Sequence, residues 1–566
     1  MLRFAGFVVP IFVFLLYLVY TLFFSVNFPF QDDFLLIQFT EAIAPGGLGF
    51  FGMIRELFRS FNDHIAAIPR LIGLVEYSLT GNLNFRFYIV LIAINTTYIF
   101  YFLYSQFKKL NLPLYYFLPA PFLFFHPLYH EVSGWALNGM QHTFLTAFTV
   151  TAIILAGKRT NLSFAGALLC CFLATFTHGN GILSYPALVF YFIGVKDFKR
   201  VGITILAMFG SLAIYLIGYE SGQAMNLPKS ALVFFTSLFG FIGSSMSLWS
   251  FPELWSALTG IIIVGFVLFV TVKTAKIYFT KPLERIKPGT LELLSLFVFI
   301  FVTSLVIAIF RSWSGTTIVS RFQLYACLSI VIFYILLLSY VPYFRRRMML
   351  YGVVGLSAFY WVYSYYVNTI YVANKKTAYV ADVYNWKNER RMFSVPRQLL
   401  LNADFYLKPA YKKGVFLQSE RVVSKNELIS FFNSTPIEKK DYEVFISILD
   451  LSKKPPGTSD YERYFYVVSD IMPGPKRFLA DRFLVLRHQE NGRIYLKNAD
   501  PKVQARKVIL TKGEYFKGGF NVFFRPDDLD EGQYDLGVLD VEVGGKRTFS
   551  RVDRSLSVAD ENLLLN

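Results

Sequence analysis

The chain has 566 residues, of which 55% are apolar and only 16% are charged. A water-soluble protein carries roughly 25% charged residues, so the composition excludes a fully soluble protein, and the apolar content excludes an intrinsically disordered one. The formal net charge of +17 would suit nucleic acid, but no basic helix interleaved with stacking aromatic residues accompanies it. We therefore expect no nucleic-acid partner.

Apolar runs of about 20 residues, long enough to cross the hydrocarbon core of a bilayer, recur along the chain up to residue 370. The first run starts after a single Arg3 and lacks a small-residue cleavage site, which favours a retained helix over a signal peptide. The runs predict about eleven membrane-spanning helices. The long ones cover 4–26, 87–107, 140–156, 201–219, 254–272, 291–310, 322–340 and 350–367, and the shorter ones cover 112–125, 162–177 and 182–193.

Basic residues collect in alternate loops between these runs, for example at Lys108, Lys109 and Arg345 to Arg347. Because Lys and Arg are enriched in cytoplasmic loops, this pattern predicts a cytoplasmic N-terminus. It also places the segment 31–86 and the tail after residue 370 on the extracytoplasmic side. Nothing in the chain is an organelle address, so we expect a multi-pass protein of the plasma membrane, specifically the bacterial inner membrane.

The chain divides into three predicted regions. Residues 1–370 form a transmembrane domain whose first external loop, 31–86, carries interfacial helices at 50–61 and 66–81. Residues 371–440 form an extracytoplasmic α/β connector, with a polar helix at 375–391. Residues 441–566 form an extracytoplasmic β-rich domain that resembles a sandwich. Alternating segments predict strands at 442–449, 463–471, 483–487, 508–510, 520–524, 534–543 and 546–552, the last two joined by a hairpin at Gly544-Gly545.

The adjacent carboxylates Asp32 and Asp33 follow directly after the first apolar run. Two neighbouring acids at a membrane surface repel each other and lose hydration, so they need a compensating role. The structural alternative is a helix N-cap, a position that Asp favours.

Other polar groups fall in outer segments close to the membrane. They are Asp63-His64, His130-Glu131, the turn His178-Gly179-Asn180-Gly181, and the loop between Arg311 and Arg321 with Trp313. Five of the six histidines, all but His488, are assigned to outer segments close to the membrane, which also include His126-Pro127. No H-E-x-x-H pair is present, and Pro127 disfavours a regular helix between His126 and His130, so hydrogen bonding is preferred over metal ligation. In the tail, Asp527, Asp528, Asp530 and Glu531 predict a solvated turn, with a calcium site as the alternative.

An opening span followed at once by an external Asp-Asp, interfacial helices, many spans and an extracytoplasmic C-terminal domain resembles the GT-C superfamily of membrane glycosyltransferases. That superfamily includes protein O-mannosyltransferases and aminoarabinose transferases. The resemblance covers about the first 340 residues by topology, and it extends to Ser320-Arg321-Phe322, which is similar to a family segment whose Arg binds lipid phosphate. His130-Glu131 occupies the place where the family more often has an acid beside Arg, which leaves a divalent metal open.

The resemblance implies transfer of a sugar from a polyprenyl-phosphate donor to an extracytoplasmic glycan, lipid or protein acceptor. Asp32 and Asp33 are then the catalytic pair, with Asp32 as base and Asp33 as orienter or metal ligand, although the two roles could be exchanged. The donor phosphate would be bound by cations of the outer face, and we expect these to be Arg321, Arg311 and Arg70. The acceptor or sugar would contact Asp63, His64, His130, Glu131 and Trp313. A single base predicts inversion at the anomeric carbon.

Two other classes stay open. A transporter or flippase for lipid-linked glycans would concentrate ionisable residues near mid-membrane, whereas here they lie at the ends of the spans. A polymerase or ligase for lipid-linked glycans would rely on arginines of the outer face.

Overall fold

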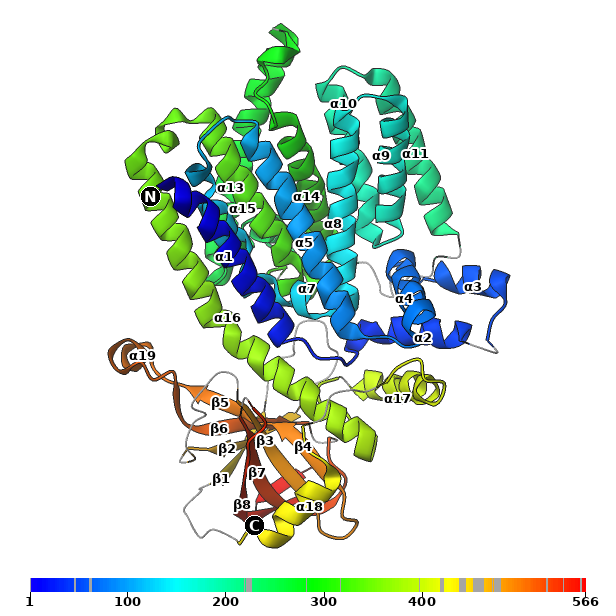
Figure 1. Cartoon of the computed structure of the whole chain (residues 1–566), viewed down its shortest axis with the longest axis vertical. Helices are drawn as coiled ribbons and strands as arrows, with labels where there is room; N and C mark the ends of the chain where they lie inside the picture. The colour runs from blue at the N-terminus through cyan, green and yellow to red at the C-terminus, as the bar shows by residue number, and fades with distance from the viewer. Residues whose placement is uncertain are drawn as a thin grey trace. The chain divides into compact units, whose positions relative to one another are not determined.

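A computed structural model describes the fold (Figure 1). The described residues are 2–44, 47–60, 64–217, 219, 226–280, 282–315, 317–395, 397–417, 422–436, 444–450, 463–470, 472, 480–525, 528–542, 544–559 and 562–565. The chain splits into two compact units. The first comprises Met1–Ser25, Asp32–Asn368 and Pro409–Leu417, and the second comprises Val26–Gln31, Thr369–Lys408 and Gln418–Asn566.

The first unit is helical. Its longer helices are α1 (Leu2–Phe23), α5 (Phe85–Lys108), α8 (Ala136–Gly157), α9 (Asn161–Thr175), α11 (Phe198–Leu216), α13 (Pro252–Thr280), α14 (Thr290–Phe310), α15 (Gln323–Tyr340) and the first part of α16 (Arg347–Glu389). Its shorter helices are α2 (Phe34–Ile43), α3 (Phe50–Leu57), α4 (Ala67–Thr80), α6 (Pro119–Phe124), α7 (His130–Gly134), α10 (Ser184–Gly194) and α12 (Ala231–Gly243).

Short 3-10 helices join these elements and carry several polar residues of interest. They are η1 (Gln31–Asp33), η2 (Leu114–Phe117), η3 (Pro127–Tyr129), η4 (Gly179–Leu183), η5 (Ser244–Met246), η6 (Leu283–Arg285), η7 (Ser312–Ser314), η8 (Ser320–Phe322) and η9 (Pro342–Arg345). As predicted, no regular helix joins His126 to His130, because His126 is extended and Pro127 opens η3.

Seven helices of the described residues are long and apolar enough to cross a membrane, namely α1, α5, α8, α11, α13, α14 and α15. Each coincides with a predicted span, which confirms a multi-pass membrane protein. The other four predicted runs are shorter or more polar: α9 and α10 have 15 and 11 residues, prolines divide 112–125 into η2 and α6, and 350–367 forms part of α16. The count of about eleven and the orientation stay predictions.

The spans pack through aromatic and aliphatic side chains buried at their centre. One cluster joins Tyr17 of α1, Phe102 of α5, Leu145 of α8 and Leu328 of α15. Helices α5 and α8 lie side by side, as Figure 1 shows. These four spans therefore share one core, while α9, α10 and α11 pack in a second cluster that contains Cys171 and Tyr185.

Helix α12, which the sequence does not predict, crosses α13 very closely. A Cβ added to Gly243 would lie 2.1 Å from the Ser256 carbonyl oxygen, and one added to Gly260 would lie 1.9 Å from that of Phe239. Only glycine permits this backbone approach. At 13 residues α12 is too short to give the signal of a full span.

The segment between the first two spans is helical, as predicted. Helix α3 matches the expected helix at 50–61 and α4 the one at 66–81, and neither is among the seven candidate spans. Helix α4 stops at Gly81, which takes the left-handed conformation at φ +78°. Helix α2, directly after Asp33, is an additional element of the same segment.

The second unit combines helices with two antiparallel sheets. Its helices are the rest of α16, α17 (Arg397–Lys412), α18 (Lys425–Ser434) and α19 (Arg506–Lys512). Its strands are β1 (Val444–Asp450), β2 (Arg463–Ser469), β3 (Asp481–His488), β4 (Ile494–Asn498), β5 (Asp500–Val503), β6 (Phe516–Phe524), β7 (Gly532–Val541), β8 (Arg547–Ala559) and β9 (Asn562–Leu565). One sheet has the order β1-β2-β6-β5 and the other β4-β3-β7-β8-β9.

The two sheets share one core. Phe465 and Phe520 of the four-stranded sheet join Leu484 and Tyr534 of the five-stranded sheet in a single buried cluster. The sheets therefore pack face to face, and the predicted β-rich, sandwich-like region is present. The polar helix predicted at 375–391 is the C-terminal part of α16, which continues without a break from the predicted span at 350–367.

The predicted hairpin is confirmed, because β7 pairs with β8 up to Val541 opposite Arg547, around Gly544 at φ +106° and Gly545 at φ +84°. The strand predicted at 508–510 is wrong, since those residues belong to α19. Periodicity alone does not separate so short an apolar run into helix or strand. Strand β5 was not expected, partly because it contains Pro501, which an edge strand tolerates.

Candidate functional site

The candidate site centres on Asp32 of η1 and Arg321 of η8, two residues of the first unit that interact electrostatically. Burial raises the pKa of the half-buried Asp32 above its ordinary value, and the Arg321 charge opposes that rise. The Nε of Arg321 is buried and has no hydrogen-bond partner among the described residues. Arg321 thus keeps a donor that an anionic or carbonyl oxygen of a ligand could satisfy.

The backbone around Arg321 is held by the loop that contains His130 and Glu131. The Arg321 amide donates to Glu131 Oε2 at 3.1 Å, and the Glu131 amide donates to Ser320 Oγ at 3.2 Å. Ser320 Oγ in turn donates to the Leu128 carbonyl at 2.7 Å and lies 3.1 Å from His130 Nδ1. His130 and Glu131, predicted to contact the acceptor, therefore fasten α7 to the start of α15.

Asp33 has a different environment from its neighbour Asp32. It is 2% exposed, and its Oδ1 accepts a hydrogen bond from the Leu137 amide at 2.7 Å. This amide belongs to the first turn of α8, where N–H groups have no partner within the helix. Asp33 thus stabilises the N-terminus of α8, so a capping interaction exists, but with a helix distant in sequence rather than with the one that Asp33 precedes.

The imidazole rings of His64, His178 and His142 pack against one another at tilted angles of 33° and 39°, and the Arg321 charge acts on His178; we call the three rings the histidine stack. The ring centroids of His64 and His178 lie 4.0 Å apart, and those of His178 and His142 lie 5.3 Å apart. His142 Nδ1 also lies 2.9 Å from the Tyr325 hydroxyl. His142 was counted among the outer segments, but it lies inside α8 and is 2% exposed. A histidine within an apolar helix was itself a signal that the residue could be functional.

The turn that carries His178 is tightly built. The Asn180 amide donates to His178 Nδ1 at 3.3 Å, and the Gly181 amide donates to the His178 carbonyl at 2.7 Å. Burial first, and then the charges of the other imidazoles, Arg311 and Arg321, hold the pKa of His178 well below its ordinary value. His178 is therefore a neutral imidazole at pH 7.

Arg311 and Trp313 lie on the loop between α14 and η8. Arg311 is exposed, and its charge is felt at His178. The Trp313 indole donates to the Phe310 carbonyl at 2.9 Å, at the end of α14. The structure therefore brings the charges of Arg311 and Arg321 to the same histidine, and the Trp313 side chain is half-exposed.

Arg70 stabilises the packing of two helices and does not belong to the candidate site. It is 2% exposed, and its Nη1 donates to the carbonyls of Leu57 at 3.0 Å and Arg59 at 2.6 Å. These bonds join α4 to the end of α3. Burial lowers the pKa of Arg70 to about 10, and the charge of Glu56 opposes that shift. Among the described residues, no contact joins Arg70 to Arg321.

No group of three His, Cys, Asp or Glu side chains that could hold a metal ion occurs among the described residues. Asp63, predicted to contact the sugar or acceptor, lies outside them. One ring nitrogen of His178 and one of His142 are already engaged, by the Asn180 amide and the Tyr325 hydroxyl. The stack is thus a set of hydrogen-bonded and ring-packed imidazoles.

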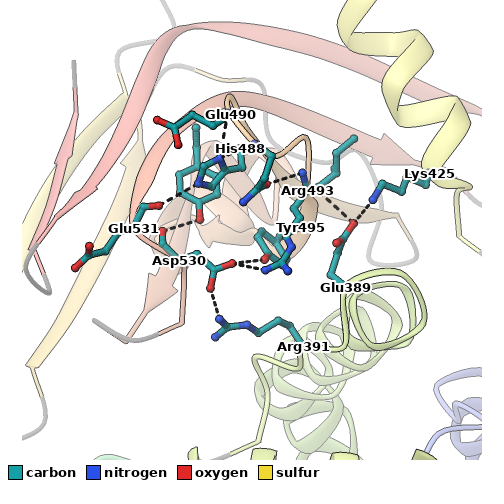
Figure 2. A network of polar contacts seen from close by, with 12 residues as sticks. Glu389, Arg391, Lys425, His488, Glu490, Arg493, Tyr495, Asp530 and Glu531 are labelled. Carbon is teal, nitrogen blue, oxygen red and sulfur yellow. Dashed lines mark hydrogen bonds and ion pairs between the residues drawn. The ribbon is translucent and has the colours of Figure 1, made fainter.

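The acidic turn of the second unit is a network of ion pairs (Figure 2). Asp530 pairs with Arg391 and with Arg493 at 2.8 Å, and it accepts from the Tyr495 hydroxyl at 2.9 Å. Asp528, buried at 7% exposure, pairs with Arg525 at 3.1 Å. The prediction of a solvated turn is wrong for Asp528, and the paired carboxylates do not favour the calcium alternative. Asp527 lies outside the described residues.

Comparison with known protein families, with characterised proteins and with solved structures finds no match to this chain. The assignment of a function therefore depends on the chain's own residues and their geometry.

Proposed function

We propose that the chain is a membrane glycosyltransferase that moves a sugar from a polyprenyl-phosphate donor to an acceptor hydroxyl on the extracytoplasmic side. The single observation that carries this proposal is the electrostatic interaction of Asp32 in η1 with Arg321 in η8. A base and a phosphate-binding cation are the two groups that such a transfer needs.

Asp32 is suited to act as the base. Its raised pKa brings the carboxylate closer to the pH at which a general base is most effective, while Arg321 keeps it ionisable. Asp32 takes the proton of the acceptor hydroxyl as that oxygen attacks the anomeric carbon. The bond from this carbon to the phosphate oxygen breaks, and its electron pair leaves with the polyprenyl phosphate. Direct displacement inverts the anomeric configuration.

Arg321 is suited to receive the leaving phosphate. Its guanidinium is always charged and binds two oxygens in a fixed geometry, and the buried Nε retains an unused donor among the described residues. Arg311 adds positive charge that also acts on His178. Stabilisation of charge that develops on the leaving oxygen lowers the barrier to transfer.

The membrane setting fits an isoprenoid donor. Arg321 opens α15, and α15 is one of the seven candidate spans. A carrier whose tail remains in the lipid can present its phosphate only near such a span end. We therefore include in the proposal the plasma membrane and the extracytoplasmic position of both the site and the second unit.

The experiment uses the purified full chain in liposomes with a panel of radiolabelled polyprenyl-phosphate sugars. Asp32→Asn should abolish transfer at unchanged folding, and Glu253→Gln, which alters an exposed carboxylate in the first turn of α13, should leave it intact. Arg321→Ala should raise the KM for the donor about tenfold or more, the effect of losing a charged hydrogen bond. Full turnover by Asp32→Asn would remove Asp32 from the base role, and labelled lipid that moves between leaflets without turnover would favour a flippase.

A ligase or polymerase for lipid-linked glycans is the second candidate. Such an enzyme relies on arginines of the outer face, and here the charges of Arg311 and Arg321 both act on the neutral His178. In that case the base is an imidazole. Loss of turnover in His178→Gln together with full turnover in Asp32→Asn would select it.

A further inference from the structure

An apolar groove lies between α10, α13 and α14 in the first unit. Its cavity volume is about 150 Å³, and it is lined by side chains that include Phe190, Ala275, Tyr278, Ile286, Leu291 and Leu294. No side chain among the described residues is placed inside it.

The groove lies at the membrane face opposite the candidate site. It is formed by the end of α10, whose start follows His178, and by the last turns of α13. The first turns of α14 complete it, whereas Arg311 follows the last turn of that helix. The groove is thus unrelated to the Asp32–Arg321 pair.

Two cations lie over the ring of Tyr340 next to the groove, and a third, Arg345, acts on one of them electrostatically. The Lys287 and Lys273 ammonium groups lie 4.7 Å and 5.6 Å from the ring centroid. The Tyr340 hydroxyl lies 3.4 Å from Oγ1 of Thr274, a residue that lines the groove. Burial lowers the pKa of Lys287, and so do the nearby charges of Arg345 and Lys273. We call Lys273, Lys287 and Arg345 the basic cluster.

The cluster carries more positive charge than the protein around it uses. Lys287 donates to the Ser339 carbonyl and Arg345 to the Leu338 carbonyl at 2.7 Å, both at the C-terminus of α15. A helix C-terminus supplies only about half a negative charge, against three cations. Among the described carboxylates of the neighbouring segments, Asp197 pairs with Arg200 at 3.3 Å, and Glu292 pairs with Lys109 at 2.8 Å.

Lys273 is the member without a helix-capping role. It is exposed, and its ammonium contacts the rings of Tyr340 and Phe269, the latter at 5.7 Å. An ammonium held at the membrane face beside an apolar groove is the arrangement that recognises an anionic head group attached to an acyl chain.

We propose that this groove and the basic cluster bind an anionic phospholipid, with one acyl chain in the groove and the phosphate on Lys273, Lys287 and Arg345. The charge excess selects an anionic over a zwitterionic head group, because each basic residue near a membrane surface contributes attraction to anionic lipid. This site does not depend on the proposed transferase function.

The test is native mass spectrometry of the full chain in detergent with equimolar phosphatidylglycerol and phosphatidylcholine of identical acyl chains. The protein should retain phosphatidylglycerol preferentially, and Lys273→Gln should weaken that binding about fivefold. Lys108→Gln is the matched control, since Lys108 is also exposed and lies 5.9 Å from the ring of Tyr104, but it does not line the groove. Equal retention of the two lipids, or an equal loss in both variants, would overturn the proposal.

A second pair of variants tests the acyl-chain part. Ala275→Trp fills the groove and should abolish retention of phosphatidylglycerol. Val272→Trp, one turn earlier on α13 at a position that is 60% exposed, should not. Retention unchanged by Ala275→Trp would show that the groove is not the lipid site.

Discussion

Glu131 holds Arg321 through its backbone, with the Arg321 amide 3.1 Å from Glu131 Oε2. The Glu131 carboxylate therefore positions Arg321 by binding its backbone amide. Among the described residues, no contact joins this carboxylate to the Arg321 guanidinium. The loop 128–131 thus sets the position of Arg321 at the end of a span, although the two are far apart in the sequence.

Glu131 is accordingly a positioning residue. Glu131→Ala removes the acceptor of the Arg321 amide, at a cost of about 1 kcal/mol or more, and should raise the KM for the polyprenyl-phosphate donor several-fold with little change in kcat. Glu131→Gln keeps an acceptor oxygen and should restore the KM. The check is steady-state kinetics of both variants in liposomes. Equal loss in both would mean that the Glu131 charge itself is needed.

The pH dependence of transfer should report Asp32. Because burial raises the pKa of Asp32, the rate should fall with acidification at a pH above the ordinary Asp value of about 3.9. Arg321 opposes that rise, so Arg321→Gln should move the midpoint further upward. The measurement is the pH profile of kcat.

Arg59→Gln is the matched control for that profile, since Arg59 pairs with Glu56 at 3.4 Å on the surface. Its midpoint should equal that of the unmodified protein. A midpoint that stays in place in Arg321→Gln would separate Arg321 from the group that titrates.

The sequence predicted the parts of the fold that depend on local pattern. Length and apolarity located seven spans, and paired glycines located the β7–β8 hairpin. The role of Asp33 could not be predicted, because its partner is the Leu137 amide at the start of α8. Neither could the stack of His64, His142 and His178, since ring packing depends on how distant segments fold together. For Arg70, two backbone carbonyls compete with a phosphate, and no local pattern reports them.

Glu76 should make stability depend on pH. It is 6% exposed, and burial raises its pKa from 4.5 to about 7, with the Tyr88 hydroxyl and the Asn84 amide opposing. Since the folded state favours the protonated form, this stabilisation is complete below about pH 4.5 and is lost as the pH rises through 7, up to about 3 kcal/mol. Glu76→Gln should therefore raise the Tm at pH 8 relative to the unmodified chain and leave it nearly unchanged at pH 4.5.

Thermal unfolding of the purified chain in detergent at the two pH values makes the comparison. Glu253→Gln, at an exposed position, should shift neither Tm. A Tm difference between Glu76→Gln and the unmodified chain that is the same at both pH values would contradict the assignment of the slope to Glu76.

Gly181 connects the packing of the fold to the histidine stack. A Cβ added there would lie 1.9 Å from the Ala174 carbonyl oxygen, so Gly181→Ala should cost about 1–3 kcal/mol and lower the Tm. Because the Gly181 amide donates to the His178 carbonyl at 2.7 Å, the same change should displace His178 and reduce transfer. Gly210→Ala in α11, with no atom within 4 Å of the added Cβ, should instead raise the Tm slightly, since Ala is the better helix former. If Gly181→Ala kept the Tm but lost transfer, the turn would act on the site without the packing cost argued here; if both were kept, the close approach to Ala174 would be wrong.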